Sequence, residues 1–171
     1  QVFLNTNLAA AGGVLAAMFM SLAVTGKMDV TMAINGAIAG LVSITADPLS
    51  PTAGTAVIVG AIGGAIVYFS IVFLEKAGVD DPVGAISAHG TVGIYGVLVV
   101  ALTGGASFIG QLTGVVMIAA FTYLASLGTI YVINMIMPIR ASDAEQEAGL
   151  DISEVGICLL YTSDAADDVV G

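Results

Sequence analysis

The most constraining feature of this sequence is a series of apolar stretches separated by short polar clusters. A transmembrane helix needs about 20 predominantly apolar residues to cross roughly 30 Å of hydrocarbon. The clusters between the stretches are rich in glycine, proline or aspartate, which favour turns. The sequence therefore predicts five transmembrane helices joined by short loops, at about 5–24, 31–46, 53–74, 83–103 and 108–137.

The amino-acid composition points to the same class of protein. Hydrophobic residues make up 58% of the 171 residues and charged residues only 9%, and the mean hydropathy is +1.05. A soluble domain carries about 25% charged residues, so this chain lacks the polar surface that a water-facing fold requires. We predict an all-α, multi-pass membrane protein whose transmembrane region is formed by residues 1–140.

The few charges predict an orientation in the cell membrane. Residues 1–140 carry five acids and three bases, whereas the other eight acids follow position 140. If five helices alternate in direction, Lys27, Lys76 and Arg140 lie on one side, which the positive-inside rule makes cytoplasmic. The tail at 141–155 is then cytoplasmic as well. Three bases cannot neutralise a run of phosphates, which excludes nucleic-acid binding.

Glycines recur at helical spacing within the apolar stretches. Small residues four apart let two helix backbones approach closely, which drives helix association in lipid. We therefore expect these glycines to make helix contacts and to bind no ligand. The motifs are Gly36-xxx-Gly40, Gly60-xxx-Gly64 and Gly110-xxx-Gly114, together with the run Gly90, Gly93 and Gly96.

His89 is the only histidine in the sequence. Asp81 followed by Pro82 predicts an N-cap with proline at the first helical position, which places His89 about 12 Å further along the helix. An ionisable side chain at that depth faces the bundle interior, where it pairs, lines a polar path or relays protons. A histidine that only hydrogen-bonds a neighbouring helix is the alternative, and within a membrane span we favour the functional role.

The other polar residues in the stretches are small, and hydrogen bonding within and between helices is their expected role. The sequence contains no Ser/His/Asp constellation, phosphate-binding loop or carboxylate pair within a stretch, and one cysteine, Cys158, cannot build a disulfide or a cysteine metal site. We therefore expect no enzyme activity, no cofactor and no metal. The small polar residues are Asn35, Ser43, Thr45, Ser87 and Thr91.

Three segments of this sequence resemble motifs of the Amt/Mep/Rh ammonium transporter family. They are Asn35-Gly-Ala-Ile-Ala-Gly-Leu-Val-Ser-Ile-Thr45, Asp80-Asp-Pro-Val-Gly-Ala-Ile-Ser-Ala-His-Gly90 and Glu147-Ala-Gly-Leu-Asp-Ile-Ser-Glu154, and the resemblance covers about 1–154. It implies a fold of eleven helices, built from two inverted halves and a last long helix. The five helices predicted here would be the last five, so we expect the chain to be the C-terminal piece of a longer transporter.

The resemblance also implies a function for particular residues. Family members are trimers, and each subunit has its own narrow, largely apolar pore that conducts ammonium or ammonia. His89 matches the second of two histidines that face each other in this pore, and Ala85 matches a pore-lining position one turn earlier. Thr45 matches a threonine near the pore midpoint, and Asp81 matches an acid at the helix start.

The resemblance leaves two questions about function open. The tail resembles a segment held against the cytoplasmic face, where PII-type signalling proteins dock, but an acidic terminus that is merely solvated is an equal alternative. A sensor or regulatory membrane subunit on the same fold is the alternative to transport. Residues 156–171 resemble translated sequencing-adapter read-through, and we expect them to be non-native.

Overall fold

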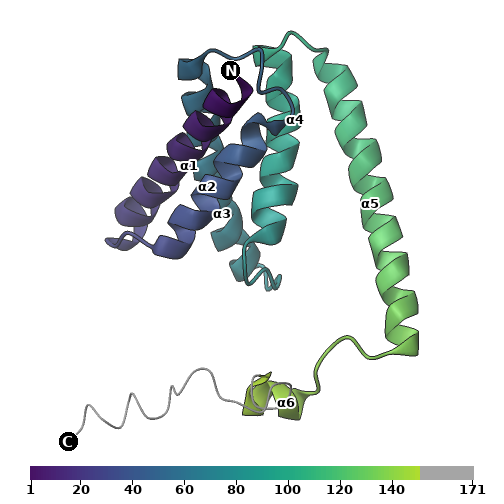
Figure 1. Ribbon diagram of the computed structural model, residues 1–171. Helices are drawn as coiled ribbons and strands as arrows, with labels where there is room; N and C mark the ends of the chain where they lie inside the picture. The colour runs from purple at the N-terminus through teal and green to yellow at the C-terminus, as the bar shows by residue number, and fades with distance from the viewer. Residues whose placement is uncertain (151–171) are drawn as a thin grey trace, which may run out of the picture. The chain divides into compact units, whose positions relative to one another are not determined.

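The computed structural model describes residues 1–150, which are helical throughout apart from turns and loops (Figure 1). This confirms the predicted all-α class. The chain divides into two units after Ala119. The helices are α1 (Val2–Thr25), α2 (Val30–Thr45), α3 (Ala53–Lys76), the π-helix η1 (Ile86–Thr91), α4 (Val92–Thr103), α5 (Phe108–Ile136) and α6 (Asp143–Ala148).

Most of these helices have the length and hydropathy of membrane spans. Within residues 1–150, α1, α3, α5 and the continuous segment formed by η1 and α4 each have at least 18 residues of suitable composition. The helix α2 is apolar but has only 16 residues. It covers the shortest of the five predicted stretches, so its length follows from the sequence.

Helices α1, α2 and α3 pack against one another through glycines. A side chain on Gly13 would overlap the carbonyl oxygen of Gly36 in α2, and one on Gly64 in α3 would overlap Gly13. Gly60 of α3 lies equally close to the backbone of Ala9. The expected helix contacts are thus confirmed for the motifs of α2 and α3. Among the described residues, Gly114 of the third motif has no neighbour within 4 Å.

The segment formed by η1 and α4 packs against α2 and α3 and runs parallel to α2. At its beginning Gly84 lies against Asn35, and further along Gly96 lies against Ser43, so both helices advance in the same direction. A buried cluster joins α2, α3 and this segment. Its members are Ala39, Val67, Ile71, Ala88 and Val92.

The fourth helical segment begins later than the sequence predicts. The predicted N-cap at Asp81 with helical Pro82 is wrong, because regular helix starts only at Ile86. The amide of Gly84 donates to the carbonyl oxygen of Asp81 at 3.0 Å, which closes a turn over Pro82 and Val83. Gly84 has φ +71°, a left-handed conformation that glycine tolerates and a helix cannot continue through.

Two further elements complete the described chain. The helix α5 has 29 residues, none of them buried. In the second unit, α6 begins with a capping box in which the Ser142 hydroxyl and the Glu145 carboxylate each accept a hydrogen bond from the other residue's amide. The predicted tail at 141–155 is described only to Leu150, and Cys158 and the segment 156–171 lie outside the described residues.

Candidate functional site

The candidate site is centred on His89, in the middle of η1. Ser87 and Ala88 are buried against α2 and α3, with 0% and 1% of their surfaces exposed. His89 and Gly90 are exposed, so the histidine points away from the packed side of its own helix. Within the described part of the chain the imidazole makes no hydrogen bond. Among these residues His89 therefore does not make the interhelical hydrogen bond that is the alternative to a functional role.

The backbone around His89 is a π-helix, which the sequence does not predict. The amide of Val92 donates to the carbonyl oxygen of Ser87, five residues back, in place of the usual four. A single π turn inside an α-helix is rare and occurs frequently at functional sites. No residue-type pattern in Ile86–Thr91 distinguishes this turn from an ordinary helical one, so only the structure could reveal it.

The carboxylate of Asp81 caps the beginning of η1, although Asp81 lies several residues before the helix. Its two carboxylate oxygens accept hydrogen bonds from the amides of Ile86 at 3.0 Å and Ser87 at 3.1 Å. Partial desolvation acts to raise the pKa of Asp81, but the hydrogen bonds from these amides lower it below the ordinary value. The carboxylate is thus ionised near neutral pH and compensates the positive end of the helix.

Of the other predicted site residues, one lies close to His89 and one does not. Ala85 directly precedes η1, is exposed and shares a face with His89 one turn later. Thr45 is the last residue of α2, is exposed, and donates its hydroxyl to the carbonyl oxygen of Leu41 at 2.6 Å. Gly96 of the parallel η1–α4 segment lies against Ser43, so Thr45 lies further along the bundle than His89.

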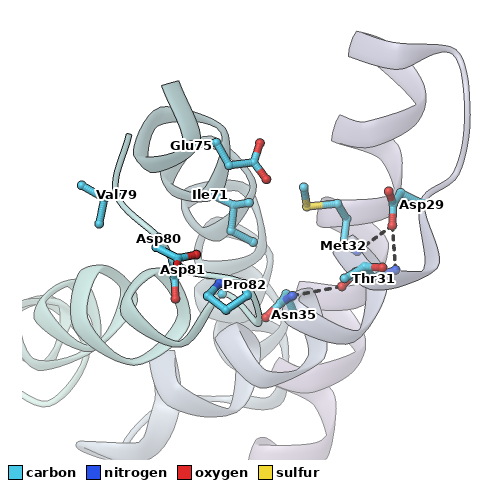
Figure 2. A pocket seen from close by; sticks show the side chains of 11 residues that line it. Asp29, Thr31, Met32, Asn35, Ile71, Glu75, Val79, Asp80, Asp81 and Pro82 are labelled. Carbon is cyan, nitrogen blue, oxygen red and sulfur yellow. Dashed lines mark hydrogen bonds between the residues drawn. The ribbon is translucent and has the colours of Figure 1, made fainter. Parts of the chain in front are cut away.

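A cleft of about 380 Å³ lies beside the loop that leads into η1 (Figure 2). It is lined by α2, by the C-terminal end of α3 and by the loop that leads into η1. Four carboxylates border it, and Asn35 forms part of its wall. The sequence pattern assigns these acids no common role, because they come from three elements that only the fold brings together. They are Asp29, Glu75, Asp80 and Asp81.

Comparison with known proteins identifies the family. A model of the Ammonium Transporter Family matches residues 1–157. The chain belongs to this family. Ammonium transporter Amt2 of Archaeoglobus fulgidus is 34% identical over 171 residues, covering 88% of this chain and 36% of that protein. The ammonium transporter of Bacillus subtilis is 30% identical, covering 90% of this chain and 42% of that protein.

Solved structures agree with the family assignment. A structure described as a Sensor Amt Protein matches with a TM-score of 0.77 and 31% identity, covering 90% of this chain and 41% of that one. Candida albicans Mep2 matches with a TM-score of 0.75 and 26% identity, covering 84% of this chain and 37% of that one. The chain thus has the Amt/Mep transporter fold and spans well under half the length of these relatives. Its relatives are named as transporters, and the family is one of multi-pass membrane proteins rather than of enzymes.

Proposed function

We propose that the full-length protein conducts ammonium or ammonia across the cell membrane and that His89 lines the conducting path. The observation that carries this proposal is the exposed imidazole on a helix whose opposite side is tightly packed. A polar ring in hydrocarbon is costly, and such residues face a bundle interior or a polar cavity. In the complete transporter the exposed face of η1 would therefore meet the other half of the fold.

A neutral imidazole at this place suits the chemistry of ammonium transport. Moving an ammonium ion from water into an apolar pore is expensive unless acceptors replace its hydration or the ion releases a proton. The ring of His89 can accept a hydrogen bond or a proton and can pass a proton on. Ala85, one turn earlier on the same face, would keep the path narrow and apolar, and Thr45 would offer a hydroxyl further along.

The same proposal includes the assembly and its orientation. The two lysine loops and the end of α5 fall on one side if the helices alternate, which favours a cytoplasmic tail. Similarity to the family supports a homotrimer with one pore in each subunit. The acidic tail at 141–155 would be available to a PII-type signalling protein on the cytoplasmic face.

Methylammonium uptake tests the role of His89. The full-length gene would be expressed in cells that lack ammonium transporters, as wild type and as His89→Ala, with Thr113→Ala as a control because that hydroxyl bonds only within its own helix. Loss of one hydrogen bond to a charged group, about 1.5–3 kcal/mol, predicts a fall of roughly 10- to 150-fold in uptake or in discrimination against potassium. Unchanged uptake and unchanged discrimination in His89→Ala would refute the proposal.

A sensor is the second candidate function, and the similarity to a Sensor Amt Protein favours it. In a sensor the fold would bind ammonium and pass the signal through the tail, with little transport. Wild-type protein that inserts into the membrane and supports no uptake, yet changes the signalling state of the cell when ammonium is added, would support the sensor. Rapid uptake by wild type would favour the transporter.

A further inference from the structure

The end of η1 is tied to α3 by a hydrogen bond between two hydroxyl groups. The Ser70 hydroxyl of α3 donates to the hydroxyl oxygen of Thr91, the last residue of η1, at 3.0 Å. Both side chains border a groove of about 590 Å³ whose other lining side chains are apolar. In lipid, water does not compete for this bond, and the low dielectric strengthens it.

Thr91 uses its hydroxyl differently from other threonines of these helices. Five of those threonines donate the hydroxyl to the carbonyl oxygen four residues back. They are Thr25, Thr45, Thr103, Thr113 and Thr129. For Thr91 that carbonyl belongs to Ser87, and it accepts from the Val92 amide in the π turn. The bond from Ser70 thus engages the side chain of Thr91 in a turn where its usual acceptor is already in use.

The π turn contains one residue more than an α-helical turn, and the contacts around it decide where that residue can lie. Gly84 lies against Asn35 and Gly96 lies against Ser43, so α2 fixes the segment on both sides of η1. Removing the extra residue would shift one of these contacts, so the π turn can only move along the helix. A move past His89 would turn its imidazole by about 100°, the rotation per residue in a helix of 3.6 residues per turn.

His89 lies between two side chains that hold η1. Asp81 accepts from two amides at the beginning of η1, and Ser70 holds Thr91 at its end. We propose that Ser70 and Thr91 are positioning residues: their hydrogen bond fixes the π turn at His89 and keeps the imidazole on the exposed face that carries Ala85. This role rests on the proposed function, because it concerns how His89 faces the conducting path. Ser70 and Thr91 act through His89 and not on the substrate.

Loss of the Ser70 hydroxyl gives Thr91 a different partner. Its hydroxyl then turns to the usual acceptor of a helical threonine, the carbonyl oxygen four residues back. That oxygen, on Ser87, already accepts the Val92 amide that closes the π turn. Two donors then share one oxygen, which weakens the bond that closes the π turn. One hydrogen bond between neutral groups shifts such an equilibrium by about 2- to 12-fold.

Two measurements on the full-length protein test this role. Nitrogen NMR of protein labelled only at histidine, in bilayers, reports on the imidazole, and methylammonium uptake reports on the path. The signal of His89 is the one that is missing from His89→Ala. Ser70→Ala, Thr91→Val and their combination each remove the bond, whereas Thr91→Ser keeps the hydroxyl. Thr103→Val is the matched control, because its hydroxyl donates within α4, to the carbonyl oxygen of Val99 at 3.2 Å.

In Ser70→Ala and in Thr91→Val the His89 signal should shift, and uptake or discrimination against potassium should fall about 2- to 12-fold. The combined variant should be no worse than either single variant, because both remove the same bond. Thr91→Ser retains the bond and should recover the wild-type signal and uptake. Thr103→Val should match wild type in both measurements.

The two measurements separate this proposal from the function on which it rests. An unchanged His89 signal in Ser70→Ala and Thr91→Val overturns the positioning role, whatever the uptake, and so do losses that add in the combined variant. A shifted signal with unchanged uptake would uphold the positioning role and refute conduction past His89. If Ser70→Ala fails to insert into the membrane, Thr91→Val, at an exposed position of η1, still decides.

Discussion

Replacing Asp81 with alanine should loosen the beginning of η1. The carboxylate accepts from the amides of Ile86 at 3.0 Å and Ser87 at 3.1 Å, and both bonds are lost in the variant. Helix caps contribute about 0.5–2 kcal/mol, and hydrogen bonds to charged groups reach about 3 kcal/mol each. Because Asp81 is only partly buried, water can hydrogen-bond the freed amides in its place, and we expect the variant to lose about 2 kcal/mol of stability at this helix start. That is about a 30-fold larger population with a frayed η1.

Asp80→Ala is the matched control for this prediction. Asp80 precedes Asp81 directly, is exposed, and makes no hydrogen bond within the described chain. Unfolding of the full-length protein would be followed in choline buffer, and methylammonium uptake would be measured in parallel. Asp81→Ala should unfold at a lower temperature than Asp80→Ala and take up less methylammonium, because His89 is displaced with η1. Equal unfolding temperatures for the two variants would show that the reasoning about the cap is wrong.

The cap also predicts a dependence on pH. The pKa of Asp81 is lowered below its ordinary value of 3.8 in the folded protein, so folding favours the ionised form. The stabilisation is fully present above the unfolded pKa and is lost as the pH falls through the folded pKa. The stability difference between wild type and Asp81→Ala should thus be constant above about pH 5 and shrink only in stronger acid. A difference that grew on acidification would contradict the assigned sign.

Two more substitutions test the packing of the bundle. Gly60→Ala should destabilise the full-length protein by about 1–3 kcal/mol, because the new methyl group would overlap the backbone of Ala9. Gly54→Ala is the control and should not destabilise it, because no atom lies within 4 Å of the added methyl group. Thermal unfolding compares the two variants. Asn5→Leu should lower the free energy of unfolding by about 1–3 kcal/mol, because the buried side-chain amide donates to two carbonyl oxygens of the α2–α3 loop, at 2.9 and 2.8 Å. Asn7→Leu is the control: its side-chain amide donates within α1, so in the same assay it should cost less than about 1 kcal/mol.

The all-helical fold was predictable because hydropathy and turn residues act locally. Each apolar stretch holds a helix, and glycine spacing in the sequence correctly indicated the contacts of α2 and α3. Glycine spacing alone could not distinguish a motif that packs against another helix from one that does not. Gly60 meets the backbone of Ala9, while Gly114 meets nothing among the described residues. The difference depends on which helix stands opposite, and that is a property of the fold.

The acid at Asp81 belongs to a helix start, as its position in the sequence indicates, but its mode of action differs from the predicted one. Proline after an acid usually predicts a helix that begins at once. Here the left-handed Gly84 inserts a turn, and the carboxylate reaches over it to amides five and six residues later. Glycine at position 84 is compatible with both outcomes. In the observed turn Gly84 lies directly against the side chain of Asn35 in α2, a contact that the sequence does not reveal.

The exposure of His89 follows from contacts made by its neighbours. Gly84 and Gly96 let the η1–α4 segment approach α2 closely, which buries Ser87 and Ala88 on that side. The π turn has one residue more than an α-helical turn. The buried residues Ser87, Ala88 and Val92 therefore determine which face of the helix is packed, and His89 lies on the other face. The imidazole is thus carried by a helix that is tightly packed on its other side, and it makes no hydrogen bond within the described residues. Under the function proposed above, both ring nitrogens would be available to a substrate or to the opposite half of a pore.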